Sequence, residues 1–453
     1  MKLSIYQENF LAAIDDLNGQ PKGCIIVEAV PGSGKSTTSR LGMERAQGSV
    51  LVLAFNKHIA DAMKSKVPSN VSVATVNSFG HRAVMAAYKA RFDEYKTRNA
   101  MRVKKEWEGP ITRLVSLKKA TLLTTDELVR DYDLELPSDD GFMEAAKEVW
   151  IRVTRDTSSI DYDDQWFLPV VKKLPVQQYD WVFVDEAQDL SATQMQLLMR
   201  IAPRIVAVGD PRQSIYGFRG ADPRAMLKLK EATGAKVLPL SICYRCPKEV
   251  VKKVNSVYPV VESAPGASDG VVDTVPVKEL LGVHKDSWVL CRCTAPLISQ
   301  CLRFLVAGVK ATVKGRDIGK QLAGLIDKIG GEIPEFYDRL SEYEKREMER
   351  LEKLGRPTQV VEDKVESIRA LSEGVKSVDE IKRRIENVFS DVGSGVTFAT
   401  VHRSKGLECD DVYILEPGLM PHKSAKSPLA LEQEKNLMYV AYSRAMKRLR
   451  FVV

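Results

Sequence analysis

The sequence predicts an α/β protein built on two parallel-sheet cores, each carrying a small, mainly helical insertion. Short apolar runs rich in β-branched residues alternate with helical patterns in two separate zones, which is typical of parallel sheets. These runs are nearly continuous, so we expect strands that are buried on both faces. Between the strands of each zone lies a long, charged stretch with helical periodicity. At 453 residues, the chain holds about three domains' worth of material at roughly 150 residues each.

This pattern divides the chain into two interrupted cores. We expect the first core at 1–81 and 170–236 with its insertion at 82–169, and the second at 237–315 and 392–453 with a shorter insertion at 316–391. The strands expected in the first core are 24–30, 50–55, 71–75, 181–184 and 205–208. The strands expected in the second core are 288–291, 396–401, 412–415 and 449–453.

Helix-start signals support both insertions. The first insertion contains a capping-box pattern at Thr124 and Glu127, and the second contains one at Ser377 and Glu380. Both insertions carry many charged residues. For these charges we favour a solvated helical face over a dedicated binding surface.

Composition and charge exclude several classes of protein. Hydrophobic residues make up 44% and charged residues 28% of the chain, which excludes a disordered, collagen-like or disulfide-rich protein. The longest apolar stretches are far shorter than the ~20 residues of a membrane helix, and the N-terminus has no apolar signal segment. We therefore expect a soluble intracellular protein of the cytoplasm or nucleoid, with no membrane partner. The formal charge of +7 permits a polyanionic partner without requiring one.

The seven cysteines suit reduced thiols in a cytosol-like compartment. Cys243 and Cys246 form a CxxC pattern, and Cys291 and Cys293 form a CxC pattern, so a zinc or iron–sulfur site is one interpretation. No His or further Cys pair completes a tetrahedral set at the usual spacing. We favour free thiols that pack as small hydrophobic side chains.

A phosphate-binding loop is expected between an apolar strand and a helix. The loop comprises nine consecutive residues, Ala29, Val30, Pro31, Gly32, Ser33, Gly34, Lys35, Ser36 and Thr37. The glycines let backbone N–H groups turn toward phosphate oxygens at the helix N-terminus. Lys35 would reach the β- and γ-phosphates of ATP, and the Ser36 hydroxyl would bind Mg²⁺. Ala29 stands where the usual pattern has glycine, so a plain glycine-rich turn is the alternative.

A second apolar strand ends in two carboxylates, Asp185 and Glu186. In phosphate-loop enzymes the carboxylate at such a strand end orients the metal, and a neighbouring Glu can activate water. We therefore predict that Asp185 binds Mg²⁺ and that Glu186 is the general base. A surface acidic turn is the alternative. Together with the loop, this strand end predicts nucleotide hydrolysis.

The order of the motifs resembles that of superfamily 1A DNA helicases of the UvrD/Rep/PcrA type. Segments similar to the family's Q motif and motifs Ia, Ib, III, IV, V and VI lie at 7–14, 54–57, 75–80, 208–221, 242–245, 400–408 and 439–445. The short second insertion and the details of motifs III and VI are closest to the helicase core of F-box DNA helicases. Lys435 and Asn436 stand where the family has a basic pair, and the end of the chain after motif VI argues against an appended nuclease domain.

The resemblance implies two RecA-like cores and assigns nucleotide-contacting roles. Gln7 would read the adenine edge, and Tyr244 would stack on the adenine. Gln213 would sense the γ-phosphate, and Glu408 would sense the ribose or the phosphates. Two residues of the second core, Arg245 and Arg444, would act as arginine fingers on the γ-phosphate.

The same resemblance implies a path for single-stranded DNA. The expected DNA-contacting residues are Phe55, Asn56, Thr75, Asn77, Ser78, Phe79, Tyr216, Phe218, Arg219 and His402. Tyr216 and Phe218 offer flat faces on which bases stack, worth ~1–3 kcal/mol per base and independent of sequence. Core packing is the alternative for each ring. Phe218 stands where the family usually has Trp.

These observations predict an ATP-dependent helicase or translocase that moves on single-stranded DNA, in the 3′ to 5′ direction by family analogy, and unwinds duplexes. The alternative is a translocase that mainly displaces bound proteins and unwinds weakly, which the short second insertion motivates. A nucleotide-gated binding module and a small-molecule kinase are further hypotheses for its function. The expected partners are single-stranded and tailed duplex DNA and proteins of replication, repair or recombination, with the chain monomeric on DNA.

Overall fold

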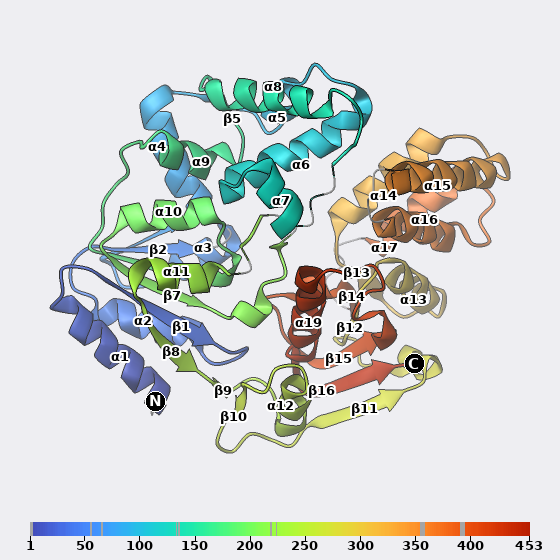
Figure 1. Cartoon of the computed structure of the whole chain (residues 1–453). Coiled ribbons are helices and arrows are strands. Elements are labelled where there is room, and N and C mark those ends of the chain that lie inside the picture. Colours follow the sequence, from blue (N-terminus) through green and yellow to red (C-terminus); the bar gives the residue numbers. More distant parts are fainter. Residues whose placement is uncertain are drawn as a thin grey trace. The chain divides into compact units, whose positions relative to one another are not determined.

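The computed structural model describes residues 3–54, 57–64, 67–132, 134, 136–217, 220–222, 224–353, 358–389 and 395–453. The chain divides into two compact units, Met1–Cys243 and Tyr244–Val453, and each unit is described by itself (Figure 1). Each unit contains one six-stranded sheet in which every described pairing is parallel. The predicted class, two parallel-sheet α/β cores with helical insertions, is confirmed.

The first sheet has the strand order β3-β2-β6-β7-β1-β8. Its strands are β1 (Gly23–Ala29), β2 (Val50–Ala54), β3 (Val71–Thr75), β6 (Trp181–Val184), β7 (Arg204–Gly209) and β8 (Lys236–Leu240). All five predicted strands are present. The sequence pattern missed β8, because this edge strand exposes Lys236 and Pro239; sheets tolerate proline at an edge.

Helices cover both faces of this sheet. Successive residues of β1 belong to two different hydrophobic clusters, one on each face of the sheet. Ile26 packs with α10 (Ala192–Ile201) and α11 (Ala225–Thr233). Ile25 packs with α1 (Ile5–Asn18) and α2 (Lys35–Arg45). The remaining described helices of this core are α3 (Lys57–Lys64) and the short 3₁₀ turns Ala187–Asp189 and Pro211–Gln213. Burial on both faces explains why the strands are nearly continuous apolar runs.

The first insertion is mainly helical, as predicted. It runs through α4 (Val76–Tyr88), β4 (Arg91–Phe92), α5 (Lys96–Asn99), α6 (Lys105–Thr121), α7 (Thr125–Asp131), α8 (Phe142–Arg155), β5 (Ser159–Ile160) and α9 (Asp164–Val171). The capping box at Thr124 and Glu127 is present. Trp107 and Phe142 pack edge to face, with ring centroids 5.7 Å apart, in a core that belongs to the insertion.

A buried network of two lysines and two aspartates also holds this insertion together. Lys119 Nζ lies 2.8 Å from both Asp161 and Asp164, and Lys96 Nζ lies 2.7 Å from Asp164. The side chains of Lys96, Lys119 and Asp164 are at most 2% exposed. On α10, the Thr193 hydroxyl donates to the carbonyl of Lys119 at 2.6 Å. The helix that follows the acidic strand end is therefore bonded to the insertion.

The second sheet has the strand order β11-β16-β15-β12-β14-β13. Its strands are β11 (Val271–Val275), β12 (Trp288–Cys291), β13 (Ala311–Val313), β14 (Val396–Thr400), β15 (Cys409–Leu415) and β16 (Ala445–Val452). The four predicted strands are present, and the two edge strands β11 and β13 were not predicted. Outside the insertion, the helices of this unit are α12 (Lys248–Asn255), α13 (Ala295–Val306), α18 (Val401–Ser404) and α19 (Pro428–Tyr442).

The second insertion consists of four helices that share one core with the sheet. They are α14 (Arg316–Ile329), α15 (Glu335–Lys353), α16 (Gln359–Ser372) and α17 (Val378–Val388). Phe336 and Ile368 from these helices belong to the same cluster of buried residues as Phe398 from β14. The capping box predicted here is only half formed: Ser377 accepts from the N–H of Glu380, but the Glu380 carboxylate accepts from Lys376 instead of Ser377.

Six of the seven cysteines are buried, including Cys243, Cys246 and Cys291. Across the described residues, no three His, Cys, Asp or Glu side chains form a group that could hold a metal ion. Within the same residues, no helix combines the length and the apolar character needed to cross a bilayer.

Candidate nucleotide site and nucleic-acid interface

The predicted phosphate loop connects β1 to α2. Its backbone is closed by a hydrogen bond from the Ser33 N–H to the Val30 carbonyl at 3.2 Å. Gly32 and Gly34 have φ angles of 69° and 80°, in the left-handed region that glycine adopts without strain. No side chain caps α2, so the N–H groups of its first turn are available to an anion. The buried Ser33 hydroxyl has no hydrogen-bond partner among the described residues, which fits a loop that holds a ligand.

Lys35 and the two carboxylates lie together at the end of β6. Lys35 Nζ donates to Glu186 Oε1 at 3.1 Å, across 151 positions of sequence. Burial lowers the pKa of Lys35, but the charges of Glu186, Asp185 and Asp210 outweigh it and leave this pKa above its ordinary value. Burial and the adjacent Glu186 raise the pKa of Asp185 to about 6. The loop and the acidic strand end therefore form one electrostatic cluster.

Glu186 is held by a chain of buried hydrogen bonds. Gln188 Nε2 donates to Glu186 Oε2 at 2.6 Å, and Gln188 Oε1 accepts from the Asp210 N–H at 3.0 Å. Gln213 Nε2 donates to Asp210 Oδ2 at 3.0 Å. A Cβ added at Gly209 would lie 2.3 Å from Gln188 Oε1, so this series of hydrogen bonds depends on glycine at position 209. Glu186 itself has a φ angle of 53°, which is uncommon for a residue with a side chain.

Sequence reasoning assigned a role to Gln213 but none to Gln188 or Asp210. Both are less than 2% exposed, and Asp210 lies in motif III. Asp210 directly follows β7 and Gln188 lies four residues after β6, so a polar residue just beyond the end of an apolar strand is the signal that could have identified them.

The donor atoms at this cluster fit a magnesium ion. Magnesium prefers hard oxygen ligands and keeps several waters or phosphate oxygens in its shell. Ser36, in the first turn of α2, is exposed, and Asp185 follows the last residue of β6. The Asp185 Oδ1 atom accepts from the Glu186 N–H at 3.0 Å, which fixes the carboxylate at the strand end.

The adenine-reading role of Gln7 stays a prediction. Its side chain completes a capping box at the start of α1: the Gln7 carboxamide oxygen accepts from the Ser4 N–H at 3.0 Å. The Nε2 group donates to Thr38 Oγ1 at 3.0 Å. Gln7 is therefore fixed against α2, the helix that carries Lys35.

The structure places the predicted DNA contacts of the first unit in different environments. Thr75 and Ser78 form a capping box at the start of α4. Asn77 Nδ2 donates to the Tyr162 carbonyl at 3.4 Å. Phe79, in contrast to the expectation of a surface contact, is 3% exposed and packs in the core. Tyr216 is half-buried.

Four predicted DNA contacts of this unit, Phe55 and Asn56 of motif Ia and Phe218 and Arg219 of motif III, lie outside the described residues. Their expected contacts with DNA stay predictions.

In the second unit, motifs IV, V and VI converge. Arg245 is ion-paired with Glu408 and lies 3.5 Å from the Ser443 carbonyl. Arg444 is 1% exposed, and its guanidinium donates to the carbonyls of Val440 and Leu407 at 2.9 and 3.0 Å. This burial is more complete than the arginine-finger prediction suggests, and the phosphate contact stays a prediction for both arginines.

Two other predicted residues of this unit have different surroundings. Tyr244 is 52% exposed, which leaves its ring available for stacking. His402 lies in α18 and is half-buried.

Comparisons with known proteins identify two segments of the chain. Residues 168–233 match the UvrD/REP helicase N-terminal domain, and residues 395–452 match the UvrD-like helicase C-terminal domain. The first match covers the acidic strand end and motif III, and the second covers motifs V and VI. The predicted resemblance to the UvrD/Rep/PcrA type is confirmed.

Curated relatives extend this similarity along most of the chain. F-box DNA helicase protein 1 of Schizosaccharomyces pombe is 24% identical over 512 residues, covering 95% of this chain and 55% of the relative. ATP-dependent DNA helicase UvrD2 of Mycobacterium tuberculosis is 26% identical over 325 residues, covering 59% and 46%. ATP-dependent DNA helicase PcrA of Leuconostoc citreum is 29% identical over 147 residues, covering 29% and 20%. The chain spans about half the length of the first of these relatives.

Proposed function

We propose that this chain, which carries the N- and C-terminal segments of UvrD-type helicases, is an ATP-driven motor that moves on single-stranded DNA and unwinds duplexes. The observation that carries the proposal is the contact of Lys35 with Glu186 beside two left-handed glycines. In this proposal the cluster would supply a phosphate cradle, a cation, a metal-binding carboxylate and a base. The helicase names of the relatives support DNA as the substrate.

In the proposed reaction, an incoming triphosphate takes Lys35 away from Glu186. The ammonium then neutralises phosphate charge, and Glu186 becomes free to accept a proton from the attacking water. Gln188 keeps the Glu186 carboxylate oriented through its 2.6 Å hydrogen bond. Magnesium, when bound by Ser36 and Asp185, would neutralise charge on the phosphates.

Gln213 and Asp210 would report the state of the nucleotide to motif III. Gln213 shares Asp210 with the hydrogen-bond chain that ends at Glu186. A change in the position of Glu186 during hydrolysis would therefore alter the hydrogen bonds of the segment that carries Tyr216. Coupling of this kind would convert hydrolysis into a change in grip on stacked bases.

The test is the rate of ATP hydrolysis by the whole chain, titrated with single-stranded DNA and with RNA of the same length. We expect stimulation by DNA and loss of turnover in Lys35→Ala. Absence of stimulation would refute a DNA-driven motor, and turnover in Lys35→Ala would refute the assigned site. Displacement of a labelled strand from duplexes with 3′ or 5′ tails tests direction, and we expect preference for the 3′ tail.

A second function, displacement of proteins from single strands with weak unwinding, is favoured by one observation. The second insertion is limited to α14–α17 and shares its core with the sheet of its own unit. Rapid clearance of a recombinase filament together with negligible strand displacement would support this function over unwinding.

A further inference from the structure

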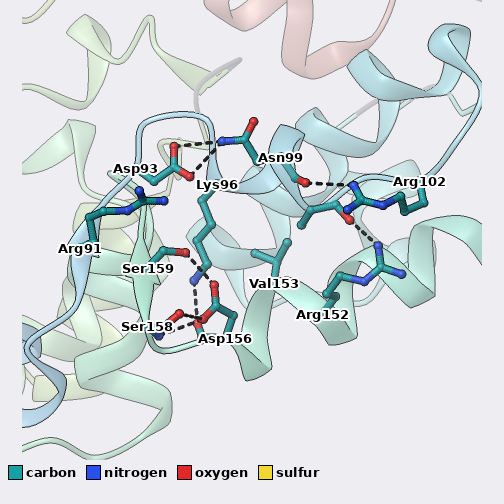
Figure 2. A pocket seen from close by; sticks show the side chains of 11 residues that line it. Arg91, Asp93, Lys96, Asn99, Arg102, Arg152, Val153, Asp156, Ser158 and Ser159 are labelled. Carbon is teal, nitrogen blue, oxygen red and sulfur yellow. Dashed lines mark hydrogen bonds between the residues drawn. The ribbon is translucent and has the colours of Figure 1, made fainter.

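The first insertion contains a polar pocket that shares no residue with the nucleotide site. The pocket has a volume of about 720 Å³ and is lined by residues of β4, α5, α8 and β5 and the segments that join them. Figure 2 shows Arg91 on one side of it and Arg102 and Arg152 on the other. This volume lies within the roughly 300–1,000 Å³ typical of ligand sites.

All three arginines are exposed, and Asp93 and Asp156 are the carboxylates that line the same pocket. In the described part of the chain, none of them forms an ion pair. Arg102 donates from one nitrogen to the carbonyls of Asn99 and Met101 at 3.4 and 3.0 Å. Arg152 donates from one nitrogen to the Ala100 carbonyl. The other nitrogens of both groups stay available, and no bond to the Arg91 guanidinium occurs among the described residues.

The carboxylates of the pocket are already satisfied by other donors. Asp93 accepts from Asn99 Nδ2 at 3.0 Å and from the Tyr95 N–H at 3.0 Å. Asp156 accepts from the hydroxyls of Ser158 and Ser159, both at 2.6 Å (Figure 2).

The remaining cation of the pocket, Lys96, is also committed. It is bonded to Asp164 at 2.7 Å and to the Asp156 carbonyl at 2.8 Å. Its charge is balanced inside the buried network. Against the carboxylates of Asp93 and Asp156, the three guanidinium groups leave the pocket with an excess of positive charge, and their planar donors match the geometry of phosphate oxygens.

We propose that this pocket is a second phosphate-binding site, separate from the phosphate loop, in which Arg91, Arg102 and Arg152 hold phosphate oxygens. The phosphate comes either from a nucleic-acid backbone or from a free polyphosphate. Because all three arginines belong to the first insertion, a phosphate bound there would be held by the insertion and not by the phosphate loop.

The first arm of the test measures DNA binding to the whole chain as a function of salt. Fluorescence anisotropy of a labelled duplex with a single-stranded tail gives the slope of log affinity against log salt concentration. Each lost phosphate contact reduces this slope by roughly 0.7 to 0.9. We expect that reduction in Arg91→Gln and about twice that in Arg91→Gln/Arg102→Gln. The control is Arg155→Gln, an exposed arginine of the same insertion outside the pocket.

The second arm measures tripolyphosphate binding by calorimetry in a Lys35→Ala background, which removes the cation of the phosphate loop. One equivalent bound to Lys35→Ala and lost in Lys35→Ala/Arg91→Gln would identify a free polyphosphate as the ligand. A response confined to the DNA arm would identify the nucleic-acid backbone. No response in either arm, or equal responses from Arg91→Gln and Arg155→Gln, would overturn the proposal. Neither arm requires ATP hydrolysis, so the result is independent of the proposed motor function.

Discussion

Removal of Lys119 should open the first insertion, because this lysine neutralises two buried aspartates. In Lys119→Met the methylene volume is largely kept, but Asp161 and Asp164 retain only Lys96 as a counter-ion. The network changes from two positive and two negative charges to a net charge of minus one in a region where Lys119 and Asp164 have no exposed surface.

The expected cost follows from this burial. Removing one partner of a buried ion pair destabilises by about 3–5 kcal/mol, because the remaining charge stays desolvated. At about 1.4 kcal/mol per factor of ten, the local opening constant should rise by roughly two to four powers of ten. Amide hydrogen exchange of peptides from α5, α6 and α9 measures this opening directly, since exchange reports the free energy of local unfolding.

Two matched variants make the prediction refutable. Lys119→Met/Asp161→Asn restores net neutrality and should regain part of the lost protection, which a double-mutant cycle detects as coupling. Arg130→Met removes an exposed pair with Asp131 in the same insertion, and should leave exchange unchanged. The electrostatic explanation is wrong if the effects of Lys119→Met and Asp161→Asn on the free energy of local opening are additive. It is also wrong if Arg130→Met changes exchange as much as Lys119→Met does.

Three further predictions concern the first insertion and the nucleotide site. Burial and the charge of Asp161 raise the pKa of Asp163 to about 6. Below pH 4 the Asp163 carboxyl is therefore neutral in the folded chain and adds no desolvation cost, whereas above pH 6 it is a desolvated charge that lowers stability. Asp163→Asn should therefore match the parent in thermal unfolding at pH 4 and be more stable at pH 8, by up to about 3 kcal/mol; equal stability at both pH values would contradict this. Gly80→Ala would place a Cβ atom 1.8 Å from the Gln165 carbonyl oxygen; a cost of about 3 kcal/mol is expected, and an unchanged melting temperature would disprove the close approach. Gln188→Leu should lower kcat about 10- to 100-fold through misplacement of Glu186, roughly 1.4–2.7 kcal/mol, with nucleotide affinity measured by fluorescence unchanged; a loss of affinity instead would mean that Gln188 acts in binding.

Most of the strands that the sequence pattern predicted are interior strands, although the predicted β3 is an edge strand with one buried residue. Ile25 and Ile26 belong to cores on opposite faces of the first sheet, so selection for burial leaves an unbroken apolar run. The edge strands β8, β11 and β13 were missed, because β13 has three residues and because β8 and β11 contain exposed residues, among them Pro239. Such segments resemble loops until a neighbouring strand is known.

At the nucleotide site, the residue types were predictable but their surroundings were not. The glycine spacing identified the loop, and the apolar run before Asp185 identified the acidic strand end. The roles of Gln188 and Asp210 depend on a hydrogen bond between the segment after β6 and motif III, which no local pattern records. The burial of Phe79 and of Arg444 likewise follows from packing against distant segments.

The amino-acid sequence alone determined the class of the fold and the chemistry of each segment. This is because strand burial, helix capping and the conformational freedom of glycine depend on a few neighbouring residues. Tertiary structure decided which charges meet. Lys35 forms an ion pair with Glu186 across 151 positions, whereas Arg91, Arg102 and Arg152 form no ion pair with any described residue. Both outcomes depend on the geometry with which distant segments pack, and desolvation then makes each pairing or its absence energetically important.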